Sequence, residues 1–187
     1  MGTAFSITPL ELPEVCLVAG KRFGDERGFF SETFRQADFA ELGLPEFRQH
    51  NHSRSERGVL RGLHFQINPS PLGKMVRCAR GRIFDVAVDV RRGSPSFGRW
   101  VAEELSDEDN RMLWVPPGFA HGFLTLSELA DVIYLQTDYW SPEHERSLRW
   151  DDPTVGIDWP LKDVKLSGRD EMAPGLDAIE TNFDFSG

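Results

Sequence analysis

Short alternating segments separated by turn residues are the feature that most limits what this chain can fold into. Apolar side chains recur at every second position, as Val86, Val88 and Val90 do, and glycine or proline interrupts the pattern about every 8–12 residues. This pattern indicates about ten short strands. The one convincing helical segment in the first half is Gln36 to Leu42, which ends at Gly43. The chain is therefore expected to form an all-β jelly-roll barrel with a cavity.

Three local expectations follow from the same patterns. The turn at Gly81 predicts a hairpin between strands at 74–79 and 83–90. Alternation predicts a strand that places Phe30, Glu32 and Phe34 on one face. A short helix is expected near residues 174–179.

Composition narrows the class of protein. The 187 residues, 40% of them hydrophobic, suit one domain that spans residues 1–187. A net charge of −9 argues against nucleic acid as a partner. The N-terminal residues do not resemble a signal peptide, and no apolar run reaches membrane-spanning length, so a soluble cytoplasmic protein without a membrane partner is expected.

The stretch from Gly58 to Gln66 carries more polarity than a core strand needs. It places Arg61, His64 and Gln66 among apolar neighbours. Strict alternation would send Arg61 and His64 to opposite faces. If both serve one site, the strand must be irregular, and Gly62 is where a bulge costs least.

A metal site is an alternative use of the histidines. His50 and His52 with Glu56, together with His121 in a Pro-x-Gly-x-x-His stretch, follow the order of ligands in metal-binding jelly rolls. Yet His50 and His52 share a face opposite Gln49 and Asn51. A metal needs three or four converging ligands, so we expect none here.

Several motifs in a fixed order resemble one family. They run from about residue 22 to about residue 174: Asp25-Glu26-Arg27-Gly28-Phe29-Phe30-Ser31-Glu32, Gln49-His50-Asn51-His52-Ser53, Val59 to Gln66, Lys74-Met75-Val76-Arg77, Phe84 to Asp89, Ser94 to Gly98, Pro117 to Phe123 and Gly156 to Pro160. The chain resembles the dTDP-4-dehydrorhamnose 3,5-epimerases. The resemblance implies a cupin-type jelly-roll barrel with a few short peripheral helices.

The resemblance also implies a chemistry. The substrate would be a 4-keto-6-deoxyhexose on thymidine diphosphate, epimerised at C3 and C5 through enolates to give dTDP-4-dehydro-L-rhamnose. Such a reaction needs a base, an acid on the opposite face and a cation or donor near the carbonyl oxygen. The resemblance implies no metal or other cofactor. It does imply a homodimer.

The family's site residues match positions in this chain. His64 matches the base, Asp170 the carboxylate that orients it, and Tyr134 the acid, which as a phenol keeps its proton at neutral pH. The remaining positions match groups that hold the nucleotide or the sugar: Arg27, Glu32, Gln49, Asn51, Arg61, Lys74, His121, Tyr139, Glu145 and Arg169.

Other functions stay open at this point. The same barrel could carry a single-carbon epimerase or a ketoisomerase, because that choice depends on small displacements of base, acid and sugar. It could also be a non-catalytic module that binds a nucleotide sugar. Each candidate has a plain alternative too, since a strand histidine is often a hydrogen-bonded core residue and lysine and arginine are usually solvated.

Overall fold

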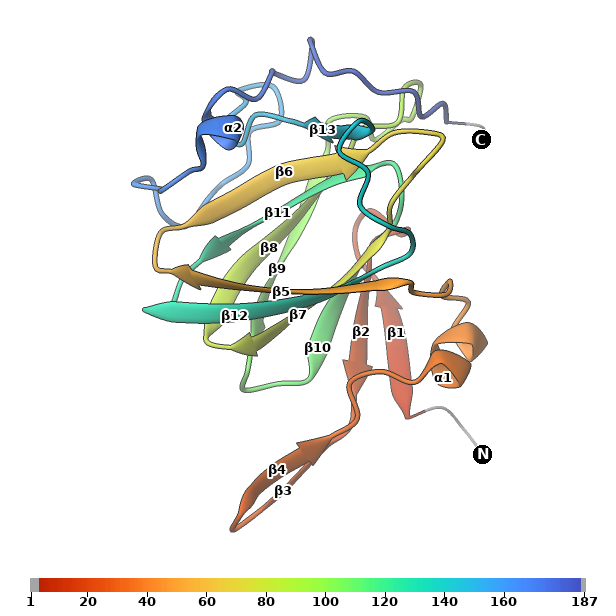
Figure 1. The fold of residues 1–187 in the computed structure, drawn as a ribbon, viewed down its shortest axis with the longest axis vertical. Coiled ribbons are helices and arrows are strands. Elements are labelled where there is room, and N and C mark those ends of the chain that lie inside the picture. The colour runs from red at the N-terminus through yellow and green to blue at the C-terminus, as the bar shows by residue number, and fades with distance from the viewer. Residues whose placement is uncertain (1–3, 186–187) are drawn as a thin grey trace.

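The computed structural model describes residues 4–185, which form two antiparallel sheets packed face to face, a projecting hairpin and two short helices (Figure 1). The six-stranded sheet runs in the order β1 (Phe5–Pro9), β2 (Cys16–Gly20), β10 (Arg111–Val115), β7 (Lys74–Arg80), β12 (Leu129–Gln136) and β5 (Gln49–Glu56). The five-stranded sheet runs β13 (Glu145–Ser147), β6 (Leu60–Gln66), β11 (Phe119–Thr125), β8 (Arg82–Asp89) and β9 (Trp100–Ser106). The expected all-β cupin-type fold is confirmed.

The core explains why β8 is apolar on both faces. Ile83 and Ala87 point between the sheets, where they join a cluster with Val76 of β7. Val86 and Val88 point outward, yet they too are buried, because the C-terminal segment covers that face. Side chains that share the face of Ile83 and Ala87 therefore lie inside the barrel.

Strand pairing differs from the expected hairpin at Gly81. β7 pairs with β10 and β12, whereas β8 pairs with β9 and β11 in the other sheet. Gly81 has a φ of +78°, and a Cβ there would lie 2.2 Å from the Leu129 carbonyl oxygen. The hairpin prediction was wrong because alternation marks strands and turns but does not say which sheet a strand joins.

Two further local predictions were wrong. The strand β4 (Gly28–Ser31) ends before Glu32, which pairs with Arg35, while Phe34 packs edge-on against Phe39. Residues 176–178 form a turn, and the second helix is instead α2 (Gly168–Glu171). The predicted first helix is present as α1 (Gln36–Glu41).

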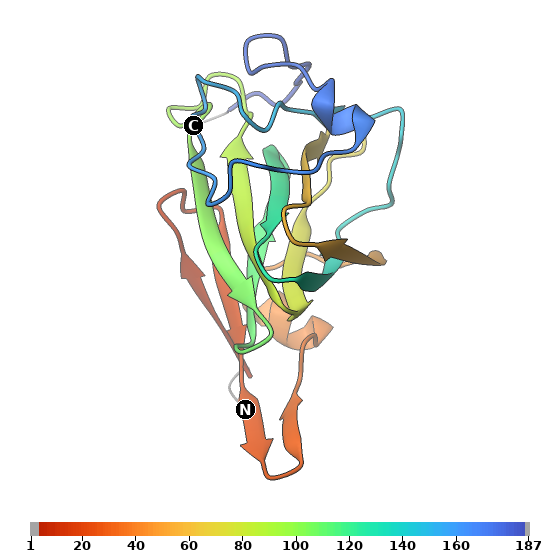
Figure 2. The same cartoon turned by 90° about the vertical axis from the view of Figure 1, so that its left-hand side faces the viewer.

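The hairpin of β3 (Arg22–Asp25) and β4 projects away from both sheets, as Figures 1 and 2 show. Its aromatic side chains are exposed: Phe23 by 61%, Phe29 by 58% and Phe30 by 69%. Within residues 4–185, no helix is long and apolar enough to cross a membrane.

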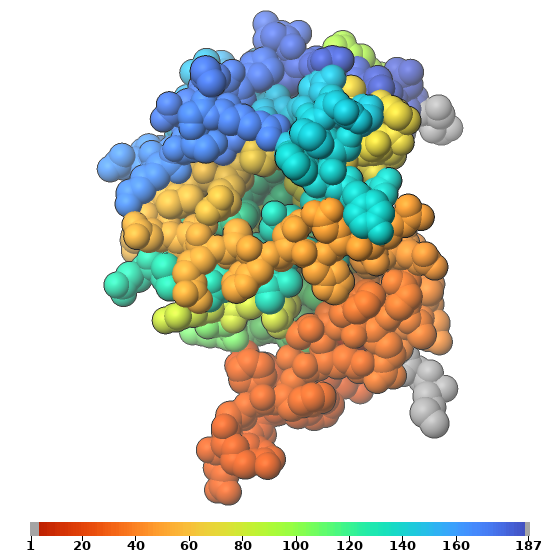
Figure 3. Space-filling model, viewed as in Figure 1, coloured from red at the N-terminus to blue at the C-terminus, as the bar shows by residue number. Residues whose placement is uncertain are grey.

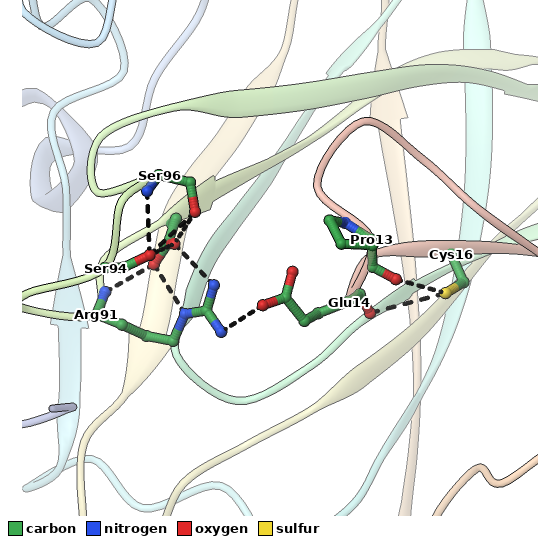
Figure 4. A network of polar contacts seen from close by, with 7 residues as sticks. Pro13, Glu14, Cys16, Arg91, Ser94 and Ser96 are labelled. Carbon is green, nitrogen blue, oxygen red and sulfur yellow. Dashed lines mark hydrogen bonds and ion pairs between the residues drawn. The ribbon is translucent and has the colours of Figure 1, made fainter. Parts of the chain in front are cut away.

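A buried ion-pair network ties the end of β8 to the β1–β2 connection (Figure 4). Asp89, fully buried, accepts hydrogen bonds from Arg91, Ser94 and Ser96. Arg91 also donates to Glu14 at 2.8 Å. These contacts satisfy a carboxylate that would otherwise be costly to bury, and they lie outside the cavity described next.

Candidate active site

Two connected chambers open between the sheets. The larger has a volume of about 510 Å³ and the smaller of about 320 Å³, and both are lined by His64, Lys74 and Tyr134. The space-filling view shows the surface hollowed between β5 and β6, beside the C-terminal segment (Figure 3). The three side chains that sequence motifs matched to base, cation and acid thus meet where the chambers join.

The alternation of side chains along β5 places its polar residues on the wall of the cavity. Gln49 and Asn51 line the smaller chamber, while His50 and His52, at the alternate positions, are exposed. This alternation confirms the expected face assignment. The histidines of the metal alternative therefore do not converge, and His52 instead contacts Asp131 on the outer surface. Among residues 4–185, no three His, Cys, Asp or Glu side chains form a potential metal site.

The strand β6 is irregular at Gly62, as the sequence predicted. His64 pairs with His121 of β11, but Arg61 pairs with Phe123, so one extra residue is accommodated on β6. Gly62 has a φ of +129°, and a Cβ there would lie 2.5 Å from Gly122 Cα. The bulge lets Arg61 and His64 line the same chamber.

His64 and Asp170 form a close pair. His64 Nε2 lies 2.6 Å from Asp170 Oδ1, and Asp170 is 3% exposed. The short helix α2 holds the aspartate, because its backbone N–H donates to the Ser167 hydroxyl at the helix N-cap. Burial raises the pKa of Asp170, but the hydrogen bond and charge of His64, together with hydrogen bonds from Ser167 and Gly62, lower it below its usual range.

A second histidine–aspartate pair lies beside the first. His121 Nε2 is 2.6 Å from Asp85 Oδ1, and the two residues are 6% and 0% exposed. Burial lowers the pKa of His121, against the opposing effect of Asp85, so the imidazole is neutral at pH 7. His121 lines the larger chamber and is the strand neighbour of His64.

Tyr134 and Lys74 face the base from the other sheet. Burial raises the pKa of Tyr134 above its usual value, so its hydroxyl carries a proton at neutral pH. Burial lowers the pKa of Lys74 to about 8, although Glu145 and Asp85 favour its charged form. At pH 7 the site therefore holds a proton donor and a mostly charged ammonium group.

The smaller chamber is organised by linked polar side chains. Gln49 Nε2 donates to Asn51 Oδ1 at 3.1 Å, and Asn51 Nδ2 donates to Gln136 at 2.8 Å. On the opposite wall Glu145 accepts hydrogen bonds from Arg169 and from Trp140 Nε1. Burial raises the pKa of Glu145, but these two hydrogen bonds, together with the positive charges of Arg169 and His64, lower it below its usual value.

Three predicted site residues do not line either chamber of this chain. Arg27 lies at the tip of the β3–β4 hairpin, with its side chain 85% exposed and paired with Asp25. Glu32 is held by Arg35, with two contacts of 2.7 Å. Tyr139 follows the end of β12 and is 64% exposed, and its neighbour Trp140 lines the smaller chamber.

Sequence reasoning missed several groups. Ser55 accepts a hydrogen bond from Arg61 Nε at 2.9 Å, and Ser53 lines the larger chamber with a buried hydroxyl that has no partner within residues 4–185. Both lie on the inner face of β5: the alternation that groups Gln49 with Asn51 also places Ser53 on that face, and one further step reaches Ser55. The sequence also indicated a role for Asp85, because an aspartate buried within an apolar strand needs a hydrogen-bond partner.

The arrangement suits proton transfer at a carbon next to a carbonyl. A histidine oriented by a carboxylate can accept a proton, and a phenol can return one. An ammonium group near the carbonyl oxygen stabilises the negative charge of an enolate. The larger chamber can hold a sugar, and it meets a polar chamber lined by amide, carboxylate and indole groups.

Comparisons with known proteins agree with this chemistry. A family model described as dTDP-4-dehydrorhamnose 3,5-epimerase matches residues 9–178. The dTDP-4-dehydrorhamnose 3,5-epimerase of Pseudomonas aeruginosa is 56% identical over 161 residues, which cover 85% of this chain and 88% of that protein.

Solved structures share the fold. A dTDP-6-deoxy-D-glucose-3,5-epimerase from Legionella pneumophila, in complex with dTDP-4-keto-L-rhamnose, superposes with a TM-score of 0.90 at 47% identity, covering 94% of this chain and 95% of the other. A 3'-monoepimerase from Streptomyces bikiniensis, in complex with dTDP-quinovose, has a TM-score of 0.85 at 36% identity, covering 90% and 86%.

Proposed function

The chain belongs to the dTDP-4-dehydrorhamnose 3,5-epimerase family, and from this we propose how its own residues carry out the reaction. The protein is an isomerase that epimerises the 4-keto sugar of its dTDP-linked substrate at C3 and C5 in dTDP-rhamnose synthesis. The observation that carries the residue assignment is the meeting of His64, Tyr134 and Lys74 where the two chambers join.

His64 acts as the base in this proposal. It removes the proton from C3 or C5, and Asp170, 2.6 Å from Nε2, orients the ring and stabilises its protonated form. Tyr134 returns a proton to the opposite face of the enolate. Its location on β12, in the sheet that faces β6, supports this division of tasks.

Lys74 stabilises the enolate. Its ammonium group is the cation at the chamber junction, and a charge placed there before the reaction stabilises the oxyanion without reorganisation. Arg61, held by Ser55, adds a second positive charge on the wall of the larger chamber.

The polar chamber takes the nucleotide part of the substrate. Gln49, Asn51 and Glu145 offer acceptors and donors there, and Arg169 supplies positive charge between the chambers. Tyr139, exposed just past β12, would stack on the thymine ring from the rim. These local charges explain how an acidic protein can bind a diphosphate.

The β3–β4 hairpin supports a homodimer. A two-stranded hairpin is marginally stable alone, and three exposed phenylalanines on it are expected to be covered by a partner. Because the Arg27 side chain is exposed and does not line this chain's own chambers, its contact with the nucleotide, which the family match implies, is made in the site of the second copy. Sedimentation should give a dimer, and Phe30→Asp should shift it toward monomer. A wild-type monomer would refute the assembly.

Isotope exchange tests the reaction. During turnover in deuterated water, the wild-type enzyme should place deuterium at both C3 and C5, because each carbon loses a proton to the base and regains one from the acid. Exchange at C3 alone would instead match a monoepimerase, and no exchange would match a binding module. Full activity in EDTA is expected, and loss on chelation would revive the metal alternative.

A further inference from the structure

Asp85 is a charged residue at the site that the proposed mechanism leaves unused. It lies in the middle of β8 with no exposed surface, and its interior-facing position puts it among apolar side chains such as Ile83 and Ala87. Its second carboxylate oxygen, Oδ2, is buried with no hydrogen-bond partner within residues 4–185. Burying a carboxylate whose second oxygen has no hydrogen-bond partner costs free energy of folding. The one close contact that Asp85 does make therefore needs an explanation.

That contact is with His121. The Cα of His121 is opposite Ala87, so Asp85, two residues along β8, is its diagonal neighbour on the same face. The Oδ1 to Nε2 distance is 2.6 Å. An ionised carboxylate can only accept a hydrogen bond, and therefore the imidazole proton belongs on Nε2. The other ring nitrogen, Nδ1, makes no hydrogen bond to any described residue, and the ring lines the larger chamber.

We propose that Asp85 is a positioning residue for the epimerase reaction: it holds His121 in the Nε2–H tautomer, so that Nδ1 meets the substrate as a hydrogen-bond acceptor. A neutral imidazole in this state presents a lone pair to the chamber. The group it recognises is a sugar hydroxyl, which can donate, and not the C4 carbonyl oxygen, which cannot. This inference rests on the proposed function.

The acceptor complements Lys74. The ammonium group can only donate, so it suits the carbonyl oxygen, while His121 can only accept at Nδ1 and suits a hydroxyl. Both residues line the larger chamber. A sugar turned the wrong way would bring its carbonyl oxygen toward the Nδ1 lone pair and its hydroxyl toward the ammonium. The pair therefore fixes which carbons face His64.

The tautomer can be read directly in the wild-type enzyme. Nitrogen-15 NMR of protein labelled at histidine distinguishes a protonated Nε2 from a protonated Nδ1, and His121→Gln assigns the signal. We expect neutral His121 with its proton on Nε2 at pH 7, with and without thymidine diphosphate. A proton on Nδ1 in the wild-type enzyme would overturn the proposal before any Asp85 variant is made.

Two variants then test whether activity follows the tautomer. Asp85→Leu removes the acceptor and should lower kcat/KM by about 10- to 100-fold, the effect of losing one charge-assisted hydrogen bond. Asp85→Asn can still accept through its amide oxygen. If NMR shows that it keeps Nε2–H, kcat/KM should stay within about fivefold of wild type. The proposal is contradicted by a variant that keeps the Nε2–H tautomer but loses activity. It is equally contradicted by a variant that loses this tautomer but stays active.

Matched controls separate positioning from folding. Asp89→Asn changes an equally buried carboxylate on the same strand, in the network of Figure 4, and should lower stability without changing the His121 signal. Asp85→Leu should also have little further effect on kcat/KM in a His121→Ala background. Additive effects would show that Asp85 does not act through His121. An inactive wild-type enzyme would instead refute the proposed function, so the two failures are distinguishable.

Discussion

The two histidine–aspartate pairs of this barrel have the same close contact but different surroundings. Both pairs are joined at 2.6 Å, and His64 and His121 are opposite each other on neighbouring strands. The His64 side chain is 24% exposed and lies at the junction of the chambers, while the His121 side chain is 7% exposed. Asp170 also has a further contact, from the Gly62 backbone N–H at 3.5 Å, and Asp85 Oδ2 has none among the described residues.

Burial therefore distinguishes the two histidines, although each is paired with an aspartate at the same distance. His64 borders open space, so a substrate carbon acid can reach it and its charged form can be solvated. His121 is enclosed, and desolvation disfavours its charged form. We therefore assign proton transfer to the pair at the chamber junction, and a fixed neutral acceptor to the enclosed pair.

The largest expected effect separates the two histidines by substitution. His64→Ala should lower kcat/KM by about 10²- to 10⁴-fold, the usual contribution of a general base. His121→Ala should lower it by only about 10- to 100-fold, because it removes one hydrogen bond to the substrate. Steady-state kinetics on both variants check this order. Thymidine diphosphate should bind both with nearly wild-type affinity, and equal losses in kcat/KM would erase the proposed distinction.

A pH profile tests the role of Lys74, the cation that lines both chambers. Burial lowers the pKa of Lys74 to about 8, so its charge is present at pH 7 and is lost as the pH rises through about 8. The profile of kcat/KM, which reports the free enzyme, should therefore fall above about pH 8. Lys74→Arg keeps its charge at all accessible pH values, and its residual activity should lack this alkaline limb. The same limb in the arginine variant would exclude Lys74 as its cause.

The smallest expected effect is on stability in acid. His121 has a lowered pKa when folded, so the unfolded chain binds more protons below pH 6.5, and the free energy of unfolding falls as the pH drops below that value. Asp170 also has a lowered pKa, but its contribution is intact above pH 3.8 and is lost only as the pH falls through its folded value.

Urea unfolding can separate these two pH windows. Between pH 7 and 5, His121→Gln should show a shallower loss of stability than the wild-type enzyme, by at most about 1.4 kcal/mol per pH unit. Asp170→Asn should differ from the wild-type slope below about pH 4, where the contribution of the Asp170 carboxylate is lost. Identical slopes for wild type and His121→Gln would mean that the enclosed histidine titrates normally.

The sequence predicted the parts of the site that depend on local periodicity. Alternation placed Gln49 and Asn51 on one face of β5, opposite His50 and His52, and predicted an irregular strand at Gly62 if Arg61 and His64 serve one site; the structure has both features. Family motifs named His64 and Asp170, which lie 106 positions apart in the sequence and in contact in the fold. Alternation can be read from the sequence because the face on which a strand residue lies depends on its position along the strand.

Other features depend on distant parts of the chain. The supposed hairpin at Gly81 joins two different sheets, because pairing is decided by strands far along the sequence. Arg27 matched a binding position, yet its hairpin carries it away from this chain's cavity. Asp85 was visible only as an aspartate in an apolar strand, and its link to His121 appears once β8 and β11 pair.

Deuterium exchange in the His64→Ala variant tests the central claim most directly. With the 4-keto sugar nucleotide in deuterated water, this variant should leave C3 and C5 free of deuterium, while His121→Ala under the same conditions should still label both carbons, only more slowly. Deuterium at either carbon in the folded His64→Ala enzyme, at the rate that His121→Ala shows, would contradict the assignment of the base to the pair at the chamber junction.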